Sequence, residues 1–192
     1  MQLIKAGSPG ELGDILGQAG IDTSSWSGEY KSLEELHQEV EHGDCFLVQD
    51  QSGQIFRRVR VVAVILDYDY QVLVEDTQTH NQTGEIRHRK IAGSLIEKLM
   101  LDESPEEGAL RLLDEEMGLK VRSRNLGTFE QGMKNMHCPS YPGLQGEYHI
   151  YRTHVQMPVE MYQSSYQEDF DPWTTSWKWV PADQANQFFE QI

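Results

Sequence analysis

The sequence predicts an α/β fold, and three observations along its 192 residues support that class. A nearly continuous apolar run at 59–66 is typical of a strand that is covered on both faces. Two segments, 32–43 and 104–118, each combine a helix-start signal, apolar residues at helical spacing and a closing glycine. Strand patterns at 71–75 and 148–155 flank the second of these helices. Strands and helices in this order are expected to pack as layers around one core.

The N-terminal part predicts a small region of helices. Residues 1–30 hold many turn formers and weak periodicity, although the apolar residues at 15–21 fit one short helix. Ser32-x-x-Glu35 is a capping box, and apolar residues at helical spacing continue to Gly43. This second segment predicts a well-defined helix with a solvated acidic outer face.

A run of strands follows. The apolar run at 45–48, the turn signal at 50–53 and the strand pattern at 54–66 together predict a hairpin. A turn at 67–70 then leads into the strand at 71–75. These strands come directly before the loop and helix that carry the strongest motif.

Basic residues gather at one place in an otherwise acidic chain. Arg87 and Arg89 follow a turn signal at 81–84. Residues two apart on a strand point to the same face, so both guanidinium groups can bind phosphate oxygens. The alternative is that they are ordinary surface residues of an exposed strand.

The segment after the second helix predicts two strands and two loops. We expect a strand at 126–129 that ends at Glu130, followed by a long irregular loop at 131–144 that forms one wall of a pocket. The acidic and aromatic segment at 160–171 is expected to be a lid or an exposed loop. A tryptophan-ended strand at 177–181 and a short helix close the chain.

The helix at 104–118 carries two adjacent glutamates, Glu115 and Glu116, near its C-terminal end. The helix dipole disfavours negative charge there, so a divalent cation with oxygen ligands is one way to stabilise the pair. A solvated acidic face is the other. At about 100° per residue, Leu112 falls between the two glutamates and away from the predicted buried stripe. That stripe consists of Ala109, Leu110, Leu113 and Met117.

Composition limits the kinds of protein that this chain can be. Acidic residues number 31 and basic residues 16, which gives a formal net charge of −15. Nucleic acid is therefore not expected as the main partner, because its phosphates are bound by clustered Lys and Arg. Two isolated cysteines, Cys45 and Cys138, suit a reducing compartment and argue against structural zinc. No signal-peptide pattern or membrane-spanning apolar run is found, so we expect a soluble, cytoplasmic protein with no membrane contact.

The segment from Gly93 to Leu119 resembles the Nudix box, a family signature written G-x5-E-x7-R-E-U-x-E-E-x-G-U with U aliphatic. The opening glycine does not fit, because Gly93 lies four residues too early. The glutamate expected directly after the arginine is replaced by Leu112. The positions that match in register are Glu103, Arg111, Leu113, Glu115, Glu116, Gly118 and Leu119.

This resemblance implies a Nudix-like α/β/α sandwich with a mixed β-sheet and the box helix on one face. It covers residues 55–192, and the closing strand at 177–181 is similar to the usual end of a Nudix domain. Residues 1–54 lie outside it. They are expected to form an N-terminal extension of short helices and a strand, packed on the main domain.

The resemblance also implies a function. Nudix hydrolases cleave a pyrophosphate bond in nucleoside diphosphate-linked or related compounds, with magnesium or manganese as the cofactor. Glu115 and Glu116 would then be catalytic residues and metal ligands, with Glu130 as a further ligand. Glu103 and Arg111 would form the ion pair that ties the loop to the helix. The partner would be a small phosphorylated molecule, and the C-terminal aromatic residues leave a homo-oligomer open.

Leu112 keeps two alternatives open. Loss of one box glutamate is compatible with a weak hydrolase, but also with a catalytically impaired Nudix-fold module that binds nucleotides or has a regulatory role. The second alternative is an acidic protein-interaction domain in which the helix carboxylates are merely solvated.

Overall fold

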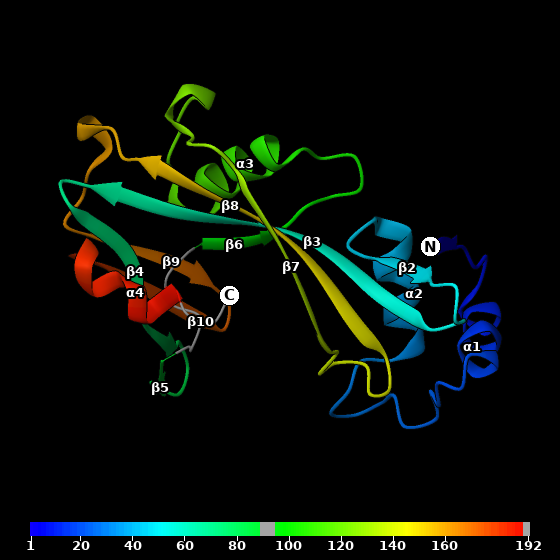
Figure 1. Cartoon of the computed structure of the whole chain (residues 1–192). Coiled ribbons are helices and arrows are strands. Elements are labelled where there is room, and N and C mark those ends of the chain that lie inside the picture. Colours follow the sequence, from blue (N-terminus) through cyan, green and yellow to red (C-terminus); the bar gives the residue numbers. More distant parts are fainter. Residues whose placement is uncertain (89–94, 190–192) are drawn as a thin grey trace. The chain divides into compact units, whose positions relative to one another are not determined.

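The computed structural model describes residues 1–88 and 95–189 (Figure 1). Short 3₁₀ turns lie at Ser123–Asn125 and Val159–Met161. The helices are α1 (Pro9–Gln18), α2 (Leu33–His42), α3 (Pro105–Met117) and α4 (Ala182–Phe189). The strands are β1 (Gln2–Ile4), β2 (Phe46–Gln49), β3 (Ile55–Tyr68), β4 (Gln71–His80), β5 (Ile86–Arg87), β6 (Leu95–Lys98), β7 (Glu130–His137), β8 (Gln145–Gln156), β9 (Ser165–Phe170) and β10 (Trp173–Pro181).

The chain forms two compact units, each assembled from three stretches of sequence. The long strands β3 and β8 contribute residues to both. The division of the chain at residue 54 stays a prediction. Unit 1 consists of Met1–Val61, Lys98–Glu103 and Gln131–Ile150, and unit 2 of Val62–Glu97, Ser104–Glu130 and Tyr151–Ile192.

In unit 1 the predicted hairpin is confirmed. Strands β2 and β3 pair antiparallel with Leu47 opposite Arg57, and β1 pairs antiparallel with the other edge of β2. The connecting turn is held by the Asp50 carboxylate, which accepts hydrogen bonds from the backbone N–H groups of Ser52 and Gln54. Such side-chain acceptors are the reason that aspartate favours turns.

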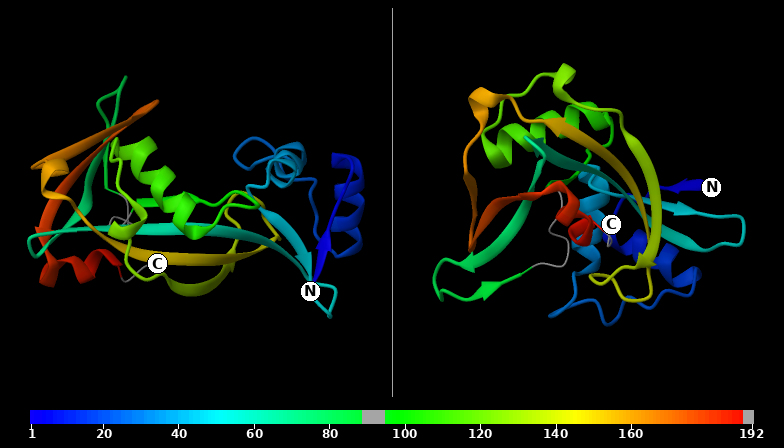
Figure 2. Two further views of the ribbon diagram at one scale, coloured as in Figure 1. Left: turned by 90° about the horizontal axis from the view of Figure 1, so that it is seen from above. Right: turned by 60° about the vertical axis from the view of Figure 1, so that its left-hand side comes forward.

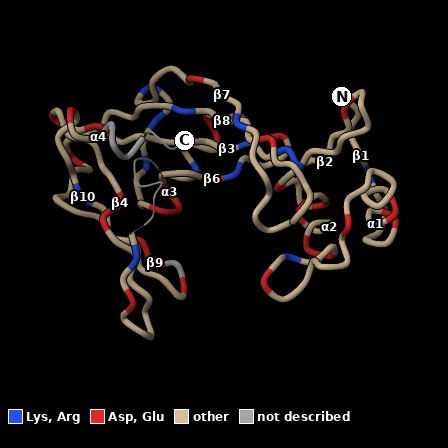
Figure 3. The backbone as a smooth tube through the Cα atoms, turned by 60° about the horizontal axis from the view of Figure 1, so that its bottom comes forward, with Lys and Arg blue, Asp and Glu red and all other residues tan. Residues whose placement is uncertain are grey.

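Capping residues determine where the helices of unit 1 begin and end. Ser8 caps α1, which begins at Pro9 and so starts six residues before the apolar segment at 15–21. The predicted helix at 32–43 is confirmed as α2, with a complete capping box between Ser32 and Glu35 and a left-handed Gly43 at its end. Figure 3 shows acidic residues along both helices.

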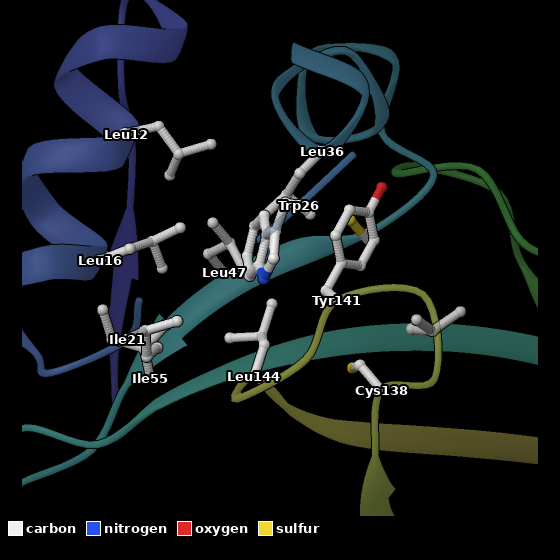
Figure 4. Packing of buried hydrophobic residues seen from close by; sticks show 12 residues of the cluster. Leu12, Leu16, Ile21, Trp26, Leu36, Leu47, Ile55, Cys138, Tyr141 and Leu144 are labelled. Atoms are coloured by element: carbon white, nitrogen blue, oxygen red, sulfur yellow. The ribbon is translucent and has the colours of Figure 1, made fainter. Parts of the chain in front are cut away.

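The core of unit 1 joins N-terminal residues to the segment at 131–150. In Figure 4, Leu12 and Leu16 of α1 face Trp26, which stands beside Tyr141. The Trp26 indole N–H donates to the backbone oxygen of Pro142 at 3.0 Å. The buried members of this core are Leu12, Leu16, Ile21, Trp26, Leu36, Cys45, Leu47, Ile55, Val59, Cys138, Tyr141 and Leu144.

In unit 2 the strands pair antiparallel in the order β4, β10, β9, and β5 pairs with β4. The turn between β3 and β4 has Asp69 and Tyr70 in the left-handed region, with φ of 43° and 62°. Ala185 of helix α4 packs on a cluster of buried strand residues. Figure 2 shows α3 and α4 on opposite sides of β3. The α/β prediction with helices on both sides of a sheet is therefore confirmed. The buried cluster that includes Ala185 of α4 consists of Ile65, Val72, Val74, Val180 and Ala185.

Two loop predictions are wrong. Residues 130–137 form strand β7, whereas we expected an irregular loop at 131–144 and a strand at 126–129. The segment at 160–171 contains strand β9 and is not simply a lid or an exposed loop. Both strands pair with a neighbour, β7 with β8 and β9 with β10. Pairing with a partner decides strand formation more than local sequence does.

Candidate functional site

Helix α3 has the boundaries that the motif predicts. The Ser104 hydroxyl accepts from the Glu107 N–H at 3.2 Å, and the Glu107 carboxylate accepts from the Ser104 N–H at 2.9 Å. Pro105 stands at the first helical position, and Gly118 ends the helix with a φ of 65°. This reciprocal cap and the left-handed glycine fix which residues of the box are helical.

Leu112 is fully buried, and so are Ala109 and Leu113. The prediction that Leu112 points away from the buried stripe is wrong. Residues at i, i+3, i+4 and i+7 share one helix face, and here that face is 109, 112, 113 and 116. Leu110 and Met117, which we placed on the stripe, are only partly buried. The box position that lacks its glutamate therefore faces the core, one turn before Glu116.

The two glutamates of the pair differ in their surroundings. Glu115 has 64% of its side chain exposed and forms an ion pair with Arg111, whose Nη1 lies 3.2 Å from Oε2 of Glu115. Glu116 is partly buried and lies at the edge of the stripe that contains Leu112. An exposed pair of this kind contributes only about 0.3–0.5 kcal/mol, so Glu115 can exchange its partner at little cost.

Glu103 lies in the loop before α3. Its carboxylate accepts from the Met100 N–H at 3.0 Å, and its backbone oxygen accepts from Nη2 of Arg60 at 3.0 Å. Arg60 also donates to the backbone oxygen of Leu101. These contacts order the loop within unit 1. The ion pair between Glu103 and Arg111 stays a prediction.

Glu130 begins β7 and is exposed. It contributes to the environment of His154, whose Nδ1 lies 2.6 Å from a carboxylate oxygen of Asp67. This hydrogen bond raises the pKa of His154 above its ordinary value, and the negative charges of Asp67 and Glu130 add to it against the opposing effect of burial. The charge of Glu130 thus acts on His154.

The carboxylates of α3 fit a magnesium ion only in part. Among residues 1–88 and 95–189, no three His, Cys, Asp or Glu side chains are grouped so that they could hold a metal ion. Magnesium usually keeps several waters and takes one or two carboxylates together with substrate oxygens. Glu115 and Glu116 provide two carboxylates on this helix, and their role as metal ligands stays a prediction.

The side chain of Arg87 is held in place by its neighbours in unit 2. Its Nε donates to Oε1 of Gln78 at 2.8 Å, and the centre of its guanidinium lies 3.8 Å from the centroid of the Trp173 ring. The Gln78 amide in turn donates to the Thr175 hydroxyl at 2.9 Å, and both of these residues are buried. His80 contacts the same indole edge-on, with ring centroids 4.9 Å apart.

The sequence indicates Arg87 as a phosphate ligand, but it does not indicate the residues that hold the Arg87 side chain in place. Trp173, Gln78 and Thr175 come together because β4 pairs with both β5 and β10. No local spacing indicates that pairing. Arg89, the second predicted phosphate ligand, lies outside the described residues.

A cavity of about 870 Å³ lies in unit 1, bordered by β1, the C-terminal end of α1 and the β2–β3 hairpin. Its lining includes Gln18, Ile21 and Gln54. Of the described residues predicted to bind metal or phosphate, none contributes to it. None of the described helices has the length and apolar character needed to cross a lipid bilayer.

Comparison with known proteins gives matches among solved structures. No protein-family model and no curated protein sequence matches the chain. It is similar to the dihydroneopterin triphosphate pyrophosphohydrolase of E. coli, with 17% identity, 66% of this chain and 82% of that chain covered and a TM-score of 0.44. An ADP compounds hydrolase matches with 15% identity, coverage of 77% and 74% and a TM-score of 0.36. The chain is also similar to the NUDIX domain of Shewanella oneidensis NrtR, solved with ADP ribose, with 17% identity, coverage of 68% and 77% and a TM-score of 0.45.

Proposed function

We propose that this chain binds a small molecule that carries a pyrophosphate group, such as a nucleoside diphosphate-linked compound, and that it hydrolyses this bond slowly or not at all. Glu115 and Glu116 hold a magnesium or manganese ion, and Arg87 contacts the phosphates. The observation that carries the proposal is the complete burial of Leu112 at the position where the Nudix box has a glutamate.

The binding of a metal ion is inferred from the negative charge of the two glutamates. Two neighbouring carboxylates at the C-terminal end of α3 oppose both each other and the helix dipole, and a divalent cation offsets both effects. Glu115 gives up only an exposed ion pair with Arg111 when it turns to the metal. The metal keeps its remaining positions for water and for phosphate oxygens.

The phosphate contact follows from the fixed orientation of Arg87. Stacking on Trp173 and the hydrogen bond to Gln78 hold the guanidinium plane. Among the described residues, Gln78 is the only hydrogen-bond partner that the guanidinium has. A planar, preoriented guanidinium binds phosphate with paired N–H donors, and little conformational freedom is lost.

The weak hydrolysis follows from Leu112. A carboxylate at this position would share the helix face of Glu116, one turn away, and could serve as a third ligand. Leucine offers no oxygen. A metal held by fewer protein ligands is positioned less firmly against the water that must attack phosphorus.

A second candidate is a working metal-dependent pyrophosphohydrolase in which Glu130 supplies the missing carboxylate. The match of Glu115, Glu116 and Gly118 to the box, on a helix with the predicted boundaries, favours this candidate. The effect of the Glu130 charge on His154, which already pairs with Asp67, weighs against it.

Calorimetric titration with Mn²⁺, followed by ADP-ribose and other nucleoside diphosphate sugars, tests the proposal. We expect Mn²⁺ binding that Glu116→Gln abolishes and that Asp114→Asn, an exposed change on the same helix, leaves intact. ADP-ribose should then bind without turnover. Rapid turnover by the unaltered chain would establish the second candidate, and a protein that binds neither metal nor nucleotide would refute both.

The variant Leu112→Glu is the direct test of the impaired site. We expect it to gain Mn²⁺-dependent hydrolysis. A buried glutamate destabilises the fold, so thermal unfolding should be followed with and without Mn²⁺. If the metal raises the melting temperature of Leu112→Glu no more than that of the unaltered chain, position 112 does not face a metal site.

A further inference from the structure

The cavity of unit 1 has the size of a small-molecule site, and its lining is rich in glutamine. Its volume of about 870 Å³ lies within the range of roughly 300–1,000 Å³ that is usual for ligand pockets. The glutamines come from β1, α1, the β2–β3 hairpin and β8, and they are Gln2, Gln18, Gln49, Gln54 and Gln145. Their amide groups supply hydrogen-bond donors and acceptors without adding charge.

The lining of the cavity is nearly free of ionisable groups. Lys5 is the one ionisable side chain among the described residues that line it, although the whole chain has 31 acidic residues. Lys5 is exposed, so solvent and salt screen its charge. A charged ligand is stable in a partly enclosed site only when opposite charges or several hydrogen bonds compensate it. The lining therefore favours an uncharged ligand.

Two of the glutamines are oriented by hydrogen bonds within the protein. The Gln49 amide donates to the backbone oxygen of Gly53 at 3.0 Å. The Gln145 amide nitrogen lies 2.9 Å from Nδ1 of His137, and an amide nitrogen can only donate in such a contact. In both residues the amide oxygen remains as an acceptor for a ligand.

Two further glutamines are adjustable. Gln18 and Gln54 are exposed, and neither side chain has a hydrogen-bond partner within the described part of the chain. Their amides can turn to present either N–H donors or a carbonyl acceptor. A hydroxyl group is both a donor and an acceptor. A ligand with several hydroxyl groups can therefore use the oriented and the adjustable amides together.

Aliphatic side chains supply the apolar part of the lining. Ile15, Ile21 and Ile55 contribute to it, and no aromatic residue is found among the described residues that line the cavity. A nucleobase gains much of its affinity from stacking on an aromatic ring. A saturated ring instead packs its C–H groups against aliphatic carbon atoms. The lining thus suits a sugar or a cyclic polyol better than a base.

We propose that this cavity binds a neutral polyhydroxylated molecule, a sugar or a polyol, through the amides of Gln18, Gln49, Gln54 and Gln145. The proposal is independent of the metal and phosphate site, because the described residues assigned to that site do not line the cavity. Binding in the cavity needs no metal ion.

Titration of the ¹⁵N-labelled chain with glucose, maltose and myo-inositol, each in the presence of EDTA, tests the proposal. We expect the side-chain amide signals of Gln18 and Gln54 to shift with at least one of these probes. Gln18→Met/Gln54→Met keeps the side-chain length but removes both amides, so it should bind that probe about tenfold more weakly. Gln38→Met is the matched control, because Gln38 is exposed on α2 outside the cavity lining. No shift with any probe, or equal affinity of the double variant and the control, would overturn the proposal.

Glucuronate distinguishes a neutral ligand from an anionic one. Its carboxylate is the group that Lys5 would attract, and we expect it to bind no more tightly than glucose. Tighter binding of glucuronate that Lys5→Gln abolishes would assign the cavity to an anion and refute a neutral ligand. Because EDTA removes Mn²⁺, a failure in these titrations leaves the proposed function untouched, and the loss of Mn²⁺ binding at α3 leaves this site untouched.

Discussion

The Arg57 guanidinium donates two hydrogen bonds to one carboxylate oxygen of Glu39 inside the core of unit 1, from Nη2 at 2.6 Å and from Nε at 3.1 Å. Lys31 binds the other oxygen at 2.6 Å. Burial alone would raise the pKa of Glu39, but the hydrogen bonds and charges of these two cations outweigh it and lower the pKa to about 2. The carboxylate is thus ionised within an otherwise apolar core.

The first prediction is an acid sensitivity that depends on Glu39. Its pKa is lower in the folded chain than in the unfolded one, so the unfolded state binds more protons below the ordinary value of 4.5. The free energy of unfolding should therefore fall as the pH drops from about 5 toward 2. Urea denaturation over this range should show a smaller fall for Glu39→Gln. The exposed Glu34→Gln should behave like the unaltered chain, and an equal fall in all three proteins would contradict the prediction.

The second prediction concerns Leu112 as a core residue. Leu112→Ala removes a fully buried side chain, so it should lower the free energy of unfolding by about 2–5 kcal/mol. Leu110→Ala on the same helix is the control, since Leu110 is only partly buried and its loss should cost less. Chemical denaturation measures both. A cost for Leu112→Ala no greater than for Leu110→Ala would mean that position 112 does not face the core.

The third prediction is a stabilising substitution in the turn between β3 and β4. Asp69 and Tyr70 both have positive φ between the paired residues Tyr68 and Gln71, which is the type I′ arrangement that favours glycine at its second position. Tyr70 is 92% exposed, so Tyr70→Gly loses little packing and relieves strain of about 1 kcal/mol. The melting temperature should rise. Tyr70→Ala keeps the strain, and an equal rise for it would rule out this explanation.

The fourth prediction separates phosphate binding from metal binding. Arg87→Lys removes the planar fork and Trp173→Leu removes its support, so each should weaken ADP-ribose binding about tenfold, a loss near 1.4 kcal/mol. Mn²⁺ affinity should not change. Arg124→Lys, an exposed change in unit 2, is the control. Unaltered ADP-ribose affinity in both variants would remove Arg87 from the proposed site.

The fifth prediction is a pH dependence at His154. Its raised pKa means that protonation stabilises the folded chain, fully so below the ordinary value of 6.5, and that this contribution is lost as the pH rises through the raised pKa. NMR titration of the imidazole should show the raised pKa. Asp67→Asn should lower it, because the Asp67 hydrogen bond is the largest cause. A titration that Asp67→Asn leaves unchanged would argue against this pair.

The helices could be predicted because their signals are local. The capping serines and left-handed glycines of α2 and α3 lie within a few residues of the turns that they stabilise. The strand β7 could not, because its sequence lacks apolar alternation and its pairing with β8 decides its structure. The direction of Leu112 could not be predicted, because Leu110 and Met117 indicate a buried stripe that is displaced from the one in the structure. Trp173 lies far from Arg87 in sequence, so no spacing could relate them.

The assembly of each unit from three stretches of sequence has a consequence for how this chain can be cut or recombined. Tyr141 and Leu144 share the core of unit 1 with Leu12 and Leu36. Cutting the chain at any single position therefore cannot give a fragment that contains unit 1 alone and complete. A fragment that starts at residue 55 would expose the apolar side chains that its missing partners cover. We therefore expect neither unit to be exchangeable as a contiguous gene segment, so that both must be inherited together.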